Sequence, residues 1–177
     1  MRTPFLVAGL GVLALLLEGA LAEMLGVRWI PDFGLLVPIA AALWLGPVEG
    51  LLVAAAVGLA ADTLSGSLLG QQTFLRLLEF AATRIVGSKL DLRRSLPLTV
   101  FVLAVGLADA LAMGGLTRLF LGELPLSARQ LAGLATRAAI SALVAPAVAG
   151  MVRRMVERRG EFEARREMRL ETRRPTF

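Results

Sequence analysis

Residues 29–64 read WIPDFGLLVPIAAALWLGPVEGLLVAAAVGLAADTL, and this stretch decides the class of fold. It holds two apolar runs, 29–45 and 48–64, separated only by Gly46 and Pro47. A helix that crosses a bilayer needs about 20 predominantly apolar residues, with a range of about 17–25. Both runs reach that range, and the break between them leaves room only for a tight turn. We therefore predict a helical hairpin inside a membrane.

Further apolar segments flank this hairpin on both sides. They cover residues 5–25, 71–86, 96–116 and 131–152. The segment 71–86 is the weakest because it carries Arg76 and Glu79, but these lie three residues apart and can neutralise each other. We predict an all-α integral membrane protein, with a six-helix transmembrane bundle over residues 1–152 and a basic cytoplasmic tail over residues 153–177.

Composition excludes several classes of site. Of the 177 residues 56% are hydrophobic, and the mean hydropathy is +0.73, whereas soluble domains are about 45–50% apolar. Cys and His are both absent, so the usual ligands of zinc, haem and iron–sulfur clusters are missing. Ser–His and Cys–His catalytic pairs are missing as well. We expect no cofactor, no metal and no enzymatic activity, although an intramembrane enzyme using Asp62 or Asp109 stays open as a third reading.

The distribution of Lys and Arg predicts the topology. Cytoplasmic loops of membrane proteins are enriched in these residues. With six spans and a cytoplasmic N-terminus, the inner segments hold 14 Lys and Arg residues and the outer loops hold three. Nine of the 14 lie in the tail, which we expect to rest near anionic lipid rather than to bind nucleic acid. We predict a bacterial inner-membrane protein with both termini in the cytoplasm, in which 5–25 is kept as a span although it also resembles a cleavable secretory signal.

Small residues recur every fourth position along the second helix of the hairpin. The positions are Gly46, Gly50, Ala54 and Gly58, and Asp62 ends the series. Small residues at this spacing let a second helix approach closely. The strip is either an internal seam or a docking surface for a single-span partner, and we predict the docking surface, beside Pro31 and Asp32. Asp62 either caps the following turn or makes a polar contact, inside the bundle or with a partner, and the cap or internal bond is favoured.

Two ionisable residues fall in the middle of their segments. Asp109 and Arg137 lie at comparable depth in the fifth and sixth segments, where an unpaired charge is disfavoured. We predict that they form an intramembrane ion pair, and the alternative is a polar cavity for a ligand or a proton. Glu18 and Glu23 receive no role.

The hairpin resembles a known family. The motifs are Trp29-Ile30-Pro31-Asp32, Gly46-Pro47-Val48-Glu49-Gly50, and the pattern G-L-x-x-D-x-L-S-G-x-x-x-G from Gly58 to Gly70. Together they are similar to MreD, the rod-shape-determining membrane protein, over residues 29–78. One departure is that the Gly46-Pro47 turn lacks the basic residue that the family often places there.

The resemblance implies a non-enzymatic subunit of the bacterial cell-elongation machinery. Such a subunit binds a single-span MreC-like partner and acts with the MreB filament, the RodA glycosyltransferase and a penicillin-binding protein in sidewall peptidoglycan synthesis. The resemblance also implies a fold similar to the substrate-binding subunits of energy-coupling-factor vitamin transporters. The residues expected to bind the partner or support the fold are Pro31, Asp32, Gly50, Ala54, Gly58, Asp62, Gly66 and Gly70.

The alternative function is a vitamin-binding substrate subunit of an energy-coupling-factor transporter. Those subunits tend to carry an A-x-x-x-A contact for their coupling partner on the first helix. Segment 5–25 has no such pair, although Ala56/Ala60, Ala108/Ala112 and Ala138/Ala142 occur on later helices.

Overall fold

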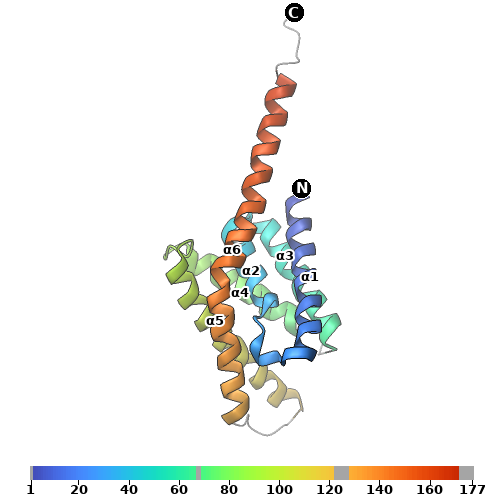
Figure 1. Cartoon of the computed structure of the whole chain (residues 1–177), viewed down its shortest axis with the longest axis vertical. Helices are drawn as coiled ribbons and strands as arrows, with labels where there is room; N and C mark the ends of the chain where they lie inside the picture. The colour runs from blue at the N-terminus through green and yellow to red at the C-terminus, as the bar shows by residue number, and fades with distance from the viewer. Residues whose placement is uncertain (1, 67–68, 122–127, 172–177) are drawn as a thin grey trace, which may run out of the picture.

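The computed structural model describes the backbone of residues 2–66, 69–121 and 128–171, and the side chains of residues 3–66, 69–112, 115 and 130–158. Within these residues the fold is all-helical, with no strand, as predicted. Figure 1 shows helices packed side by side, with one of them continuing far beyond the bundle. The elements are α1 (Arg2–Leu25), η1 (Val27–Trp29), α2 (Phe33–Trp44), α3 (Pro47–Ser65), α4 (Gln71–Gly87), α5 (Ser95–Leu121) and α6 (Ala128–Glu171).

Five helical segments of the described chain are long and apolar enough to cross a membrane. They are Thr3–Leu25, Val27–Trp44, Pro47–Ser65, Ser95–Ala112 and Gln130–Arg158. The protein is therefore a multi-pass membrane protein. Helix α4 falls outside this set because it has only 17 residues, and it also carries Arg76, Glu79 and Arg84.

Helix α2 forms the centre of the bundle. Its residues from Gly34 to Ala42 are all buried, and it packs against α1, α3, α4 and α6. A helix that is apolar on every side buries every side, and α2 has no charged residue between its ends. Asp32 caps its first turn, since the backbone N–H of Leu35 donates to Asp32 Oδ1 at 2.9 Å.

The predicted hairpin is present in the structure. Helix α2 ends at Trp44 and α3 begins at Pro47, the first helical position, where proline lacks only an N–H that has no partner inside the helix anyway. Helix α4 then returns alongside α3 and α2. Its far end is tied to α2 because Arg84 Nη1 donates to the carbonyl oxygen of Ala42 at 3.1 Å.

The remaining pair, α5 and α6, packs closely. A Cβ atom at Gly106 would lie 3.2 Å from Cβ of Ala138, so the glycine sets how near the two helices come. Helix α6 continues into the predicted tail as far as Glu171, and near the start of the tail Arg153 pairs with Glu157 at 3.1 Å. In Figure 1 the start of α1 and the end of α6 lie toward the same end of the bundle.

Candidate functional site

The strip of small residues on α3 lies inside the molecule. Gly50, Ala54 and Gly58 are buried, and they face α2 and α4. A Cβ atom at Gly58 would lie 2.5 Å from Thr73 Cα, and one at Gly50 would lie 2.6 Å from a ring carbon of Phe80. The prediction that this strip is an exposed docking surface was wrong, because the neighbour that it admits at close range is α4 of the same chain.

Asp62 caps the start of α4, as the favoured interpretation of this residue held. Its carboxylate accepts hydrogen bonds from the backbone N–H groups of Gly70 (2.9 Å), Gln72 (2.8 Å) and Thr73 (3.1 Å), and from the Thr73 hydroxyl (2.6 Å). The first N–H groups of a helix have no partner within the helix, so a buried carboxylate at this position satisfies them. Gly66 (φ 61°) and Gly70 (φ 94°) flank the turn in left-handed conformations that favour glycine.

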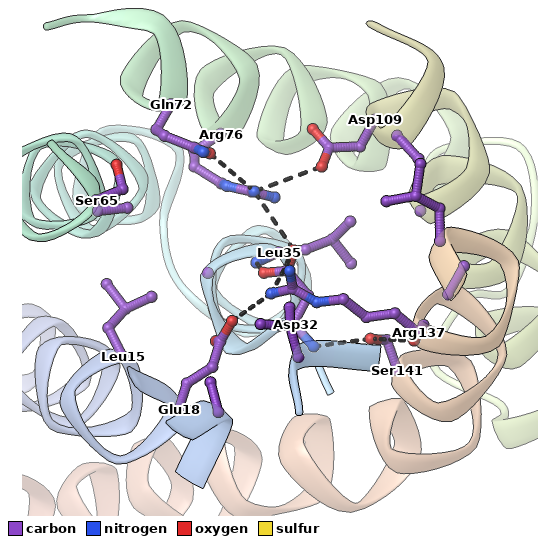
Figure 2. Close-up of a pocket in the computed structure, with 18 of the residues that line it drawn as sticks. Leu15, Glu18, Asp32, Leu35, Ser65, Gln72, Arg76, Asp109, Arg137 and Ser141 are labelled. Carbon is purple, nitrogen blue, oxygen red and sulfur yellow. Dashed lines mark hydrogen bonds and ion pairs between the residues drawn. The ribbon is translucent and has the colours of Figure 1, made fainter. Parts of the chain in front are cut away.

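A cluster of charged side chains occupies the region between the helices. Figure 2 shows Asp32 near its centre, with Arg76 from α4, Asp109 from α5, Arg137 from α6 and Glu18 from α1 pointing toward it. These five residues come from five different helical segments, so only the folded chain brings them together. An unpaired charge inside a bilayer is costly. The ion pairs among these side chains offset that cost, so all of these helices can pack in the bundle.

Arg76 connects three carboxylates. Its Nη1 lies 2.6 Å from Glu79 Oε1, which confirms the expected neutralisation within α4. Its Nη2 lies 3.5 Å from Asp109 Oδ2 and 3.7 Å from Asp32 Oδ2. The same nitrogen also donates to Gln72 Oε1 at 3.1 Å. Only 4% of the Arg76 side chain is exposed, so these contacts are buried within the bundle.

Arg137 contacts a different pair of carboxylates. Its Nη2 makes a close ion pair with Glu18 Oε1 and lies 3.3 Å from Asp32 Oδ2. The predicted direct pair of Asp109 with Arg137 is therefore corrected. Both residues belong to one cluster, as their equal depth suggested, but Arg76 takes Asp109 and Glu18 takes Arg137.

Sequence reasoning missed the role of Glu18. A single signal was available, namely an acidic residue isolated within the apolar run of the first segment, which requires a partner at the same depth. Depth alone pairs Arg137 with Asp109, but depth does not say which helices are neighbours.

Backbone contacts fix the entry into α2 beside this cluster. The Asp32 N–H donates to Ser141 Oγ at 2.8 Å, and the Phe33 N–H donates to Glu18 Oε2 at 3.0 Å. The Ser141 hydroxyl in turn donates to the carbonyl oxygen of Arg137 at 2.9 Å. Pro31, which precedes Asp32, is half-buried at this entry. The first turn of α2 is thus held between α1 and α6.

The cluster lines a cavity of about 370 Å³. This volume lies within the range of about 300–1,000 Å³ that is usual for small-molecule sites. Apolar side chains including Leu15, Leu64 and Leu134 form part of its wall. It is lined from the C-terminal half of α1, the end of α3, the start of α4 and the facing parts of α5 and α6, so it lies at the end of the bundle away from the start of α1.

Several polar atoms at this site have no protein partner. Among the described side chains, the buried atoms Arg76 Nε, Glu79 Oε2, Asp109 Oδ1 and Arg137 Nε have no hydrogen-bond partner. Buried polar groups are normally satisfied, and exceptions often mark a site for water, an ion or a ligand. The arrangement can therefore bind and orient a small polar molecule.

Comparisons with protein-family models, with curated proteins and with solved structures found no match to this chain.

Proposed function

We propose that the protein is a non-enzymatic membrane subunit of the bacterial cell-elongation machinery that binds an MreC-like partner. The observation that carries the proposal is that the residues of the MreD-like pattern hold defined positions in the fold. Asp32 and Asp62 each organise the start of a helix. Gly50 and Gly58 permit the close approach of α4. These structural roles make the pattern more informative than a general membrane composition.

The proposed topology has six spans with both termini in the cytoplasm of a bacterial inner membrane. It needs α4 as the sixth span, and this is supported by the burial of Arg76 and Glu79 against each other and against the cluster. The basic loop after α4 would then be cytoplasmic. The Cζ atom of Arg93, in this loop, lies 4.9 Å from the centroid of the Trp44 ring, and the Cζ atom of Arg153, on α6, lies 5.6 Å from it. Such an arrangement is typical of an interfacial aromatic residue.

The MreC-like partner would be a single-span protein that docks on an outward face of the bundle, because the small-residue strip is already occupied by α4. Through that partner the protein would act with the MreB filament, RodA and a penicillin-binding protein to support rod shape and sidewall peptidoglycan synthesis. The bundle itself would then serve as a scaffold, with membrane lipid around it.

The test is co-purification from membranes with an MreC-like protein, paired with rescue of rod shape in cells that lack their own MreD. The expected result is recovery of the partner and restoration of rods. A chain that reaches the membrane at normal level, recovers no partner and leaves the cells round would overturn the proposal.

A second candidate function is favoured by the cavity. A substrate-binding subunit of an energy-coupling-factor transporter requires a small-molecule site within a helical bundle, and the charged cavity supplies one. Recovery of the transmembrane coupling subunit of such a transporter, in place of the MreC-like protein, would support this candidate.

A further inference from the structure

We propose that the cavity binds a small organic cation, a molecule with an ammonium or guanidinium group on a partly apolar frame. The inference deepens the second candidate function, since both place a small molecule inside the bundle. It does not depend on the elongation function, because it needs only the cavity and its charges.

The first step is the charge balance of the cluster. The connected ion pairs contain four carboxylates, from Glu18, Asp32, Glu79 and Asp109, and two guanidinium groups, from Arg76 and Arg137. Three of these carboxylates, those of Glu18, Asp32 and Asp109, line the cavity together with both guanidinium groups, so carboxylates exceed guanidinium groups there by one. Among the described side chains no other cationic group lines the cavity.

The second step is the cost of that excess. A charge buried away from water is strongly unfavourable unless an opposite charge and hydrogen bonds compensate it. Asp109 shows the deficit directly, because the Arg76 guanidinium group that its Oδ2 faces is shared with Glu79 and Asp32. The carboxyl group lines the cavity, so a cationic N–H donor placed there would complete it with a charge-assisted hydrogen bond.

The third step distinguishes an organic cation from a metal ion. Among the described residues no group of three or more acidic side chains is arranged to hold a metal. Guanidinium groups instead lie between the carboxylates, as Figure 2 shows for Arg76 between Asp32 and Asp109. A cation with directional N–H donors suits separated carboxylate oxygens better than a metal that needs several oxygens around one point.

The fourth step concerns the remainder of the ligand. Leucine side chains of α1, α3 and α6 contribute to the wall, which favours an apolar portion. The unpartnered Nε atoms of Arg76 and Arg137 are donors, so a hydroxyl or carbonyl oxygen on the ligand would also be accommodated.

The test uses the purified full chain in detergent and three probes that share one apolar group. They are 2-phenylethylammonium, 2-phenylethanol and 3-phenylpropionate. A ligand that binds the folded state raises the midpoint of thermal unfolding as its concentration increases. We expect the ammonium probe to raise the midpoint and the neutral and anionic probes to leave it unchanged. An equal shift with the alcohol or the carboxylate, or no shift with the ammonium probe, would overturn the proposal.

Two pairs of variants locate the effect in the cavity. Asp109→Asn should weaken binding of the ammonium probe by about tenfold or more, because it removes one charge-assisted contact, whereas Asp91→Asn in an exposed ion pair should not. Ala110→Phe should block binding by filling the cavity, whereas Ala108→Phe, at an exposed position of the same helix, should not.

The pairs also keep the proposal separate from the elongation function. Unchanged binding in both Asp109→Asn and Ala110→Phe would place the probe elsewhere and overturn the inference. Recovery of the MreC-like partner is measured on the same preparations, so absence of probe binding by the unsubstituted chain, with normal partner recovery, would overturn this inference alone.

Discussion

At the scale of single residues, two buried charges are stabilised in different ways. Asp62 is surrounded by neutral donors, three backbone N–H groups and a hydroxyl. Arg76 is surrounded by other charges, from Glu79, Asp32 and Asp109. Removing Asp62 therefore leaves unsatisfied dipoles, whereas removing Arg76 leaves unsatisfied charges.

Asp62→Ala should lower the stability of the fold markedly. Each buried donor left without a partner costs about 1–3 kcal/mol, and the substitution removes the acceptor of four hydrogen bonds. Thermal unfolding in detergent gives the measurement. Asp91→Ala is the control, and its exposed ion pair with Arg94 should contribute about 1 kcal/mol or less. Equal midpoints for the two variants would contradict the capping role.

Double-mutant cycles should rank the ion pairs of the cluster. Coupling between Arg76 and Asp109 should exceed coupling between Arg137 and Asp109, because the first pair lies 3.5 Å apart and the second is not a direct ion pair. Contacting residues typically couple by about 0.5–3 kcal/mol. The cycles combine Arg76→Gln or Arg137→Gln with Asp109→Asn and follow unfolding in detergent. A stronger coupling between Arg137 and Asp109 than between Arg76 and Asp109 would instead support the direct pair of Asp109 with Arg137 that the sequence predicts.

At the scale of elements, the seam between α3 and α4 depends on the absence of side chains. The closest atoms to a Cβ at Gly58 are the backbone Cα and N of Thr73, at 2.5 Å and 3.1 Å. Backbone atoms cannot move aside as a flexible side chain can, so a single methyl group would push the helices apart. On α1, Gly11 has a comparable neighbour in Val57, 2.6 Å away, but there the contact is a side chain.

Gly58→Ala should therefore reduce the amount of folded protein in the membrane. Overpacking in a tight contact costs about 1–3 kcal/mol, and the shift would also displace the Thr73 groups that Asp62 binds. Membrane level and thermal midpoint are measured beside Gly9→Ala, for which nothing lies within 4 Å. If Gly58→Ala accumulated and unfolded as Gly9→Ala does, the seam would not be as close as described.

Most helix bounds could be predicted from sequence to within a few residues, but the last helix ends at Glu171, well beyond the predicted end at residue 152. The Gly46-Pro47 break, the apolar runs and the start of α4 at Gln71 are local signals, and they agree with the observed bounds. The face that α3 turns inward could not be predicted, because a small-residue strip suits a neighbour from the same chain or from another. The ion pair of Glu18 with Arg137 could not be predicted either, because the two residues are 119 positions apart in sequence and no local signal says that their helices are neighbours.

At the scale of the whole molecule, the charges divide into two groups. The cluster at one end of the bundle is enclosed by helices and mutually compensated. The basic residues of the loop after α4 and those of α6 from Arg153 to Arg158 lie at the surface. Such a division is typical of a membrane protein whose inner charges maintain the bundle and whose outer ones set its orientation.

Reporter fusions should establish the orientation. Fusions within residues 87–94 and after Thr172 should both report the cytoplasm, because the Lys and Arg residues gather in these segments. A fusion between Gly66 and Gly70 should report the opposite side. A periplasmic signal at 87–94 would remove α4 from the set of spans, and one after Thr172 would contradict the shared side of the two termini.

The bridge from Arg76 to Asp109 has a consequence for how the chain is made. An arginine at the centre of a membrane helix costs about 2.5–3.5 kcal/mol on insertion scales, and within α4 only Glu79 is available to offset it. Asp32 is synthesised before α4, but Asp109 belongs to α5 and leaves the ribosome later. Helix α4 therefore reaches its final setting only after α5 has emerged. We therefore expect Arg76 to lack one of its three carboxylate partners until α5 has been translated.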